Sequence, residues 1–267
     1  MVFAVLLSLS LTADSPPHRL KWDPKVDLPI VGVTLAGWLS SEFLFKSKLA
    51  PSTCRWCEVN GFDLAVRRAF NPSLAPSAFG NPGPDAASNV LLYGTPVLML
   101  GLDSLLAWRD DALGNAPVDI ALIAEATLVA SCLNQTTKFL VGRGRPYTVQ
   151  ASQALLDTAP GKADDFISFF SGHTTFTFSV VAATATVTKL RGYRLWWLSV
   201  AVGAPLALTT GLLRLAADKH WASDVLTGMV VGTAAGLGIP LLFHGIDDQV
   251  HVQVSPLPGG LALSGTF

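Results

Sequence analysis

Two histidines and an aspartate in the second half of the chain have types and spacing that could do chemistry. His220 and Asp224 are four residues apart, so on a helix they share one face, where the carboxylate can hold one ring nitrogen and leave the other free as a nucleophile. His173 belongs to another segment and, with an ordinary pKa near neutrality, can act as a general acid. This pattern indicates nucleophilic attack followed by protonation of a leaving group.

Basic residues near these histidines indicate that the group attacked is a phosphoryl group. Lys138 can act as a point charge, while Arg145 and Arg214 can each bind two phosphate oxygens. Ser171 and Gly172 stand where a helix is expected to begin, so backbone N–H groups and the helix dipole would add donors for an anion. This chemistry requires no metal ion, and we expect no cofactor.

Six apolar segments are available to position these residues. Of the 267 residues, 50% are hydrophobic and 14% charged, whereas soluble domains have about 25% charged residues. A membrane span needs about 20 mostly apolar residues, and the stretches near that length are 28–45, 90–108, 118–139, 174–187, 195–213 and 222–243. We therefore expect an all-α polytopic membrane bundle of about six transmembrane helices. With one crossing each, the ends of the third and fifth segments meet the starts of the fourth and sixth at one membrane face.

The order and spacing of the polar residues resemble three motifs of the type 2 phosphatidic acid phosphatase and vanadium haloperoxidase superfamily. The first motif is Lys138, six residues and Arg145-Pro146, the second is Ser171-Gly172-His173, and the third is Arg214, five residues, His220, three residues and Asp224. The resemblance implies that His220 forms a phosphohistidine, that Asp224 orients it and that His173 is the general acid. It assigns phosphate binding to Lys138, Arg145, Ser171, Gly172 and Arg214.

Two positions depart from the family pattern. Phe170 stands where the second motif usually has proline, and Leu213 stands where the third usually has serine. Neither change removes an ionisable catalytic group, so the expected activity is retained.

We expect a membrane phosphatase that hydrolyses a phosphate monoester or pyrophosphate of a lipid or prenyl carrier, with the tail entering between helices. Two alternatives stay open. Vanadate-dependent halide oxidation would use the same pocket, although relatives with that activity are typically soluble. A non-catalytic lipid-binding or scramblase-like protein would keep the basic residues but would not need both histidines. With a net charge of −1 and no basic stripe, nucleic acid is excluded as a partner.

The remaining chain suggests how the protein is organised. Residues 1–27 are expected to form a candidate secretory leader and a juxtamembrane linker, 28–245 the membrane phosphatase domain with its motifs at 138–224, and 246–267 a C-terminal tail. Residues 59–70 are predicted to form an amphipathic helix at the membrane surface.

The cysteines and the basic residues bear on the orientation in the membrane. Cys54 and Cys57 form a CxxC pair that favours a structural disulfide, with two free thiols as the alternative. A disulfide and a short basic cluster at 189–194 favour a bacterial inner membrane with the active site at the periplasmic face. A cleaved leader would place the site towards the cytoplasm instead.

Other polar residues are given no catalytic role. Basic residues at helix ends are interpreted as snorkelling to the interface; these are Arg143, Lys189, Arg191 and Arg194. Two carboxylates at membrane depth, Asp103 and Glu125, are interpreted as interhelical or protonated structural groups. Surface or packing positions are assigned to His18, His244, His251, Lys219 and Trp221, although Trp221 could line an entrance for an acyl chain.

Overall fold

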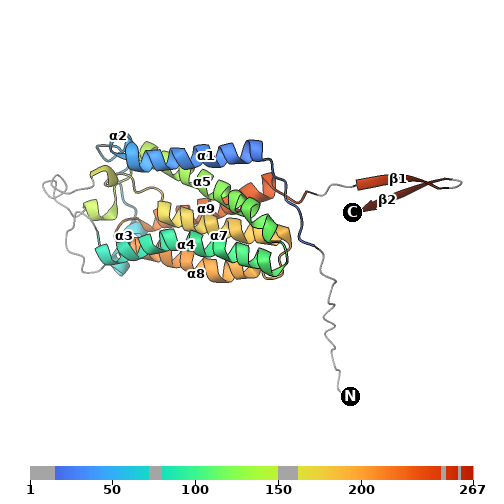
Figure 1. Ribbon diagram of the computed structural model, residues 1–267. Coiled ribbons are helices and arrows are strands. Elements are labelled where there is room, and N and C mark those ends of the chain that lie inside the picture. Colours follow the sequence, from blue (N-terminus) through green and yellow to red (C-terminus); the bar gives the residue numbers. More distant parts are fainter. Residues whose placement is uncertain (1–15, 72–79, 150–161, 248–250, 258–259, 267) are drawn as a thin grey trace, which may run out of the picture.

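Six long helices form one elongated bundle in the computed structural model, which describes residues 16–71, 80–149, 162–247, 251–257 and 260–266 (Figure 1). The helices are α1 (Pro24–Leu39), α4 (Pro82–Arg109), α5 (Ala116–Val141), α7 (Gly172–Arg191), α8 (Trp197–Ala216) and α9 (Ala222–Phe243). Each predicted apolar segment lies largely within a different one of them. The prediction of an all-α membrane bundle is confirmed.

Four of the described helices, α4, α5, α8 and α9, are long and apolar enough to cross a membrane. Helix α1 has 16 residues and is continued by a π-helical turn, η1 (Ser40–Leu44). Helix α7 is less apolar because it is rich in threonine, whose hydroxyls bond carbonyls of their own helix, as Thr184 does to Val180 at 2.8 Å. The count of about six spans is therefore approximate, with α1 and α7 completing the bundle.

Helix α7 lies at the centre, packed against α4, α5, α8 and α9. Its approach to α9 depends on Gly228, Gly232 and Gly236, which share one face of α9. A Cβ atom at Gly228 would lie 2.8 Å from the carbonyl oxygen of Ser171. Glycine lets the two backbones come close together, which holds the start of α7 beside the start of α9.

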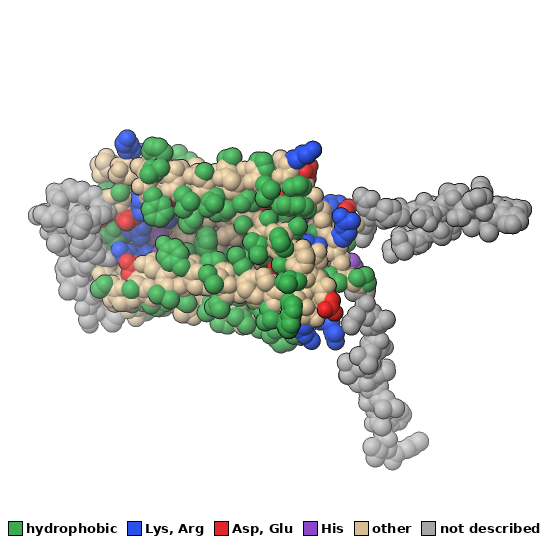
Figure 2. Space-filling model, viewed as in Figure 1, with side chains coloured by type: hydrophobic (Ala, Val, Ile, Leu, Met, Phe, Trp, Pro, Cys, Tyr) green, Lys and Arg blue, Asp and Glu red, His purple; other side chains and the backbone are tan. Residues whose placement is uncertain are grey.

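The core lies between α4, α5, α7 and α8, where Met99, Leu122, Ile123, Val180 and Ala207 pack together. The flanks of the bundle instead expose large apolar side chains, as a lipid-facing surface requires. Figure 2 shows these hydrophobic side chains along the bundle, with Lys and Arg gathered at its two ends.

Shorter elements connect or follow the long helices. They are α2 (Lys46–Leu49), α3 (Gly61–Phe70), η2 (Leu113–Asn115), η3 (Pro146–Val149), η4 (Lys162–Asp164) and the antiparallel pair β1 (His251–Leu257) and β2 (Gly260–Thr266). Helix α3 confirms the amphipathic helix predicted at 59–70, and it packs on α8 and α9. The candidate leader falls within residues 1–15, outside the described residues.

Arg191, at the end of the bundle away from η3 and η4, differs from its interpretation as a snorkelling residue. Arg191 is buried, and its Nη2 lies 2.6 Å from Oδ1 of Asp119, whose Oδ2 accepts a hydrogen bond from the Tyr193 hydroxyl at 2.9 Å. Arg191 therefore does not snorkel to the interface, because a buried carboxylate on α5 neutralises it.

Candidate active site

The ends of α5 and α8 meet the starts of α7 and α9 at one end of the bundle, as predicted. The Ser171 N–H donates to the carbonyl of Asp224 at 3.1 Å, which joins the first turns of α7 and α9. Helix α5 ends at Gly142, whose left-handed conformation (φ +63°) turns the chain across this end towards Arg145. The three sequence motifs therefore come together.

A cavity of about 440 Å³ lies at this end. Six of the eight predicted site residues line it: His173, His220, Lys138, Arg145, Gly172 and Arg214. Ser171 and Asp224 are completely buried behind the wall. Figure 2 shows Lys, Arg and His side chains in a hollow near this end of the bundle.

His220 is held by a backbone carbonyl. Its Nδ1 lies 2.8 Å from the carbonyl oxygen of Ser168, so an N–H at Nδ1 would donate there and leave the Nε2 lone pair available. Burial, followed by the charges of Arg145 and Arg214, lowers the pKa of His220 well below its ordinary value. The ring is therefore neutral at pH 7, as a nucleophile requires.

Asp224 does not hold His220 directly, which differs from the predicted pairing. Its Oδ2 lies 3.7 Å from Nδ1 of His220 and accepts hydrogen bonds from Ser168 Oγ at 2.5 Å and the Trp221 N–H at 2.9 Å. Its Oδ1 accepts from Arg143 at 2.5 Å. Asp224 thus bonds other donors, and one of them belongs to Ser168, whose carbonyl contacts the His220 ring.

Arg143 was interpreted as a snorkelling residue, and this interpretation is wrong. The side chain is buried between two carboxylates, with Nη1 2.5 Å from Asp224 and Nη2 2.7 Å from Asp63 of α3. Its guanidinium also lies 4.2 Å from the centre of the Trp56 ring. The sequence offered one unused signal, the position of Arg143 inside the Gly-Arg-Gly-Arg-Pro turn.

Lys138 lies against the first turn of α7. A Cβ atom at Gly172 would be 2.8 Å from Nζ of Lys138 and 2.9 Å from Oδ1 of Asn134, so only glycine fits here without displacing them. Asn134 also donates to the carbonyl of Phe170 at 2.7 Å, which fixes the chain entering α7. Within the described residues Lys138 has no ion-pair partner, so its charge is available to an anion.

Replacing Gly172 with alanine is expected to lower phosphate release about 10²-fold, because the added methyl group would displace Lys138 from the anion site and small misplacements carry costs of this order. Steady-state kinetics in detergent measure the effect. Gly238→Ala is the control, since a Cβ atom there meets nothing within 4 Å. Equal rates for the two variants would contradict this role of Gly172.

The two arginines are held by the protein so that they face the cavity. Arg145 donates from Nε to the carbonyl of Asp164 at 2.6 Å and from Nη1 to that of Lys219 at 3.0 Å. Arg214 donates from Nη1 to Asp85 at 2.5 Å and to Ser88 Oγ at 2.8 Å, while its Nε has no partner among the described residues. These fixed guanidinium groups are suited to phosphate oxygens.

Sequence reasoning missed five further charged residues that line the cavity. They are Glu42, Lys46, Asp85, Asp164 and Lys219, so five basic side chains face three carboxylates. Lys219 was expected to be a surface or packing residue, but it lines the cavity.

The local charges agree with an anion site. Burial alone would raise the pKa of Asp164, but Arg145 and Lys46 outweigh it and lower this pKa to about 2. Burial, together with Arg145, lowers the pKa of Lys219. The excess of positive charge among the side chains that line the cavity matches a phosphate dianion.

His173 lies across the cavity from the α9 side of the site, on the first turn of α7. Its Nε2 is 2.7 Å from Oδ1 of Asn89 on α4, a contact that no sequence motif indicated. This hydrogen bond fixes the ring facing the cavity. A substrate oxygen could take the place of Asn89 and receive a proton.

The other wall of the cavity is apolar. It is formed by Trp38, Leu39, Phe43, Leu92, Tyr93 and Phe176. Trp38 of α1 stacks on Phe176 of α7 with ring centres 5.7 Å apart. Phe43 and Tyr93 are 71% and 66% exposed on the flank of the bundle. The charged end of the cavity is thus continuous with a surface that suits an alkyl chain.

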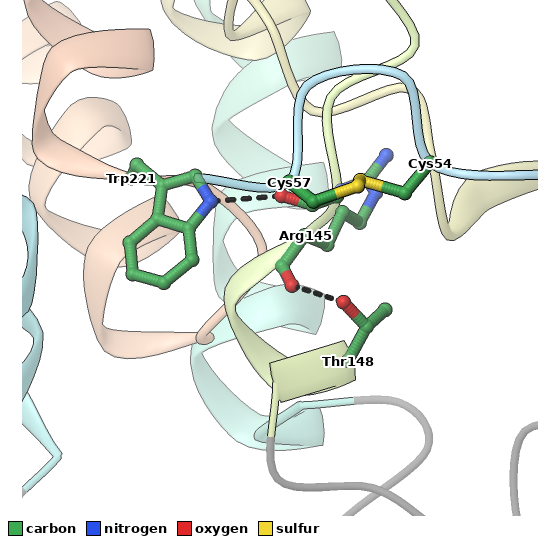
Figure 3. The surroundings of a disulfide bond; sticks show 6 residues. Cys54, Cys57, Arg145, Thr148 and Trp221 are labelled. Carbon is green, nitrogen blue, oxygen red and sulfur yellow. Dashed lines mark hydrogen bonds between the residues drawn. A yellow bond between two sulfur atoms is a disulfide. The ribbon is translucent and has the colours of Figure 1, made fainter. Parts of the chain in front are cut away.

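A second, larger cavity of about 920 Å³ lies beside the Cys54–Cys57 disulfide, and neither histidine lines it. Trp221 borders this second cavity, donating from its indole N–H to the carbonyl of Gly144 at 2.8 Å (Figure 3). Because Trp221 is 1% exposed and faces away from the apolar wall, the suggestion that it lines an acyl entrance is wrong. We place the chemistry in the smaller cavity, where the titratable groups converge.

A family model described as the PAP2 superfamily matches residues 119–247, a range that contains all three motifs. The resemblance indicated by the motifs is thereby confirmed, and His173, His220 and the cationic side chains of the motifs all lie inside the matched range.

One curated relative of this chain is the Lipid A 1-phosphatase of Porphyromonas gingivalis, which is 46% identical over 70 residues. The match covers 26% of this chain and 15% of the relative, so it spans only a small part of that protein.

Two solved structures also match. The crystal structure of Aquifex aeolicus LpxE has 21% identity and a TM-score of 0.42, covering 68% of this chain and 96% of that one. The transmembrane PAP2 type phosphatidylglycerolphosphate phosphatase from Bacillus subtilis has 16% identity and a TM-score of 0.41, covering 80% and 93%.

Proposed function

We propose that this chain is an integral membrane phosphatase that hydrolyses the phosphate ester of a lipid through a phosphohistidine. The observation that carries the proposal is a single cavity in which two histidines and five basic side chains face an apolar wall. A passive headgroup site would need the cations but not two imidazoles held by Ser168 and Asn89.

In the first step the Nε2 lone pair of His220 attacks phosphorus, and the bond from phosphorus to the ester oxygen breaks. Lys138, Arg145 and Arg214, with the N–H groups that begin α7, stabilise the charge on the remaining oxygens. His173, protonated when the phosphate dianion binds, gives its proton to the departing oxygen, which leaves as the lipid alcohol.

In the second step His173, now neutral, accepts a proton from water, and the water oxygen attacks phosphorus. The bond from phosphorus to Nε2 breaks, inorganic phosphate leaves, and His220 returns to its neutral form. Throughout both steps the Ser168 carbonyl holds the ring in one tautomer, and Asp224 in turn accepts a hydrogen bond from Ser168 Oγ.

The apolar wall supports a lipid as the substrate. Its residues lie between the cationic end and the exposed flank, so a headgroup at His220 would leave its tail beside Phe43 and Tyr93. Phosphate release should be measured from lipid A 1-phosphate, phosphatidate, phosphatidylglycerophosphate and a prenyl pyrophosphate. Lipid A 1-phosphate is tested first because the curated relative is named for it. No release from any of them would favour a non-catalytic lipid-binding protein.

The same proposal places the site at the periplasmic face of a bacterial inner membrane. The Cys54–Cys57 disulfide lies at the active-site end, and disulfides persist in oxidising compartments. The basic cluster at the other end gives weaker support than its sequence suggested, because Arg191 is neutralised by Asp119. Labelling with a membrane-impermeant reagent of single cysteines placed at each end of the bundle tests the orientation.

Full activity is expected in excess EDTA, because lysine, arginine and helix-start N–H groups replace a metal ion in stabilising the phosphoryl charge. The rate of phosphate release with and without EDTA measures this. A complete loss that only a divalent ion restores would contradict the mechanism.

A further inference from the structure

Three ionisable side chains meet at the end of the bundle away from the active site. They are Asp27 in the first turn of α1, Glu125 in α5 and His244, the residue directly after α9. One ligand atom from each lies within 4.8 Å of the other two. The three residues are only 6%, 5% and 3% exposed, so water does not solvate them freely.

Two atoms of this cluster lack hydrogen-bond partners among the described residues, namely Oε2 of Glu125 and Nε2 of His244. Oε1 of Glu125 is 3.5 Å from the same Nε2. A buried polar atom without a partner is costly. Two such atoms in one cluster indicate that a ligand is bound between them.

The orientation of the side chains favours a metal ion as that ligand. Nδ1 of His244 lies 3.2 Å from the carbonyl of Lys21, so an N–H at Nδ1 directs the Nε2 lone pair into the cluster. Metal-binding histidines are commonly oriented in this way. Oδ2 of Asp27 accepts from the Asp23 N–H at 2.8 Å, which fixes that carboxylate as well.

The charge of the cluster calls for a divalent cation. With the imidazole neutral, as a metal ligand must be, the two carboxylates leave two negative charges, and no lysine or arginine of the described residues forms an ion pair with Asp27 or Glu125. One imidazole nitrogen with two carboxylate oxygens suits zinc better than calcium or magnesium, which prefer oxygen ligands alone.

We propose that Asp27, Glu125 and His244 bind one zinc ion that clamps α1 to α5 and to the end of α9. Zinc ligands lie about 2.0–2.2 Å from the metal, so the three side chains draw together when it binds. The clamp stabilises α1, whose main packing partner is α5. The far end of α1 supplies Trp38 and Leu39 to the apolar wall of the active site.

Zinc content and thermal stability test the proposal on the full chain purified in detergent. Mass spectrometry of the metal is expected to find about one zinc per chain after dialysis against zinc. Removing zinc with a chelator should lower Tm, and adding zinc at about 100 times its Kd should raise Tm by roughly 5–10 °C. Wild-type protein that binds no zinc and shows no such shift would overturn the proposal.

Variants show whether any bound zinc occupies this site. His244→Ala and Glu125→Gln should lose the metal and the Tm response, His244→Cys should keep both because thiolate is a zinc ligand, and His18→Ala is the control outside the cluster. If both His244→Ala and Glu125→Gln retain zinc, the metal is bound elsewhere and the proposal is wrong. Because metal content does not depend on turnover, these results stand apart from the phosphatase test.

Discussion

His220→Ala is expected to reduce phosphate release at least about 10⁴-fold, since removing a catalytic nucleophile leaves only the contribution of binding and charge stabilisation. The variant should fold, because the imidazole makes one hydrogen bond, to Ser168 O, and lines a cavity. Rapid quenching of the wild-type reaction with ³²P-labelled substrate should trap an acid-labile phosphoprotein, which the variant should not form. A labelled His220→Ala protein would assign the nucleophile elsewhere.

His173→Ala separates the two histidine roles. Loss of a general acid is expected to slow hydrolysis of an alkyl phosphate about 10²–10⁴-fold. An aryl phosphate has a leaving group that needs little protonation, so His173→Ala should slow its hydrolysis much less. His220→Ala should slow the hydrolysis of alkyl and aryl phosphates equally. The same loss with both leaving groups would show that His173 acts in binding and not in proton transfer.

Arg143→Met is expected to destabilise the fold by about 3–5 kcal/mol, because it leaves two buried carboxylates, Asp63 and Asp224, without their cation. For a chain of this size that corresponds to a fall in Tm of roughly 10 °C, measured by thermal unfolding in detergent. Arg68→Met, an exposed position on α3, is the control.

A second substitution makes the Arg143 prediction more specific. Asp63→Asn added to Arg143→Met removes one of the stranded charges, so the double variant should be more stable than Arg143→Met alone. If Arg143→Met is no less stable than Arg68→Met, the buried ion pairs do not support the site.

The fold followed from the sequence because its signals are local. Runs of apolar residues identify helices, and the agreement is closest for α9, whose predicted and observed bounds coincide at 222 and 243. The sequence did not show that α7 lies at the centre of the bundle, where its threonines bond within their own helix. Hydropathy does not distinguish a central helix from one at the lipid surface.

The site was predictable only where its residues belong to motifs. His173 and His220 carry recognisable neighbours, whereas Asn89 and Asp63 become partners of the site through folding alone. Arg143 shows the reason, because Asp63 is 80 residues away in the chain and no period or spacing links the two. The same holds for His244 and Glu125: the sequence marked Glu125 only as a carboxylate at membrane depth, and nothing linked it to His244 until the helices brought them together.

The exposed apolar wall also bears on which substrate concentration governs the rate of the enzyme. A substrate that reaches His220 from the flank of the bundle is drawn from the two-dimensional lipid phase, so its relevant quantity is the fraction of lipid molecules that carry phosphate. Diluting mixed micelles with neutral detergent would then slow turnover, while adding buffer at a fixed lipid composition would not. Saturation would be reached on a scale of mole fraction, set by the composition of the surrounding membrane.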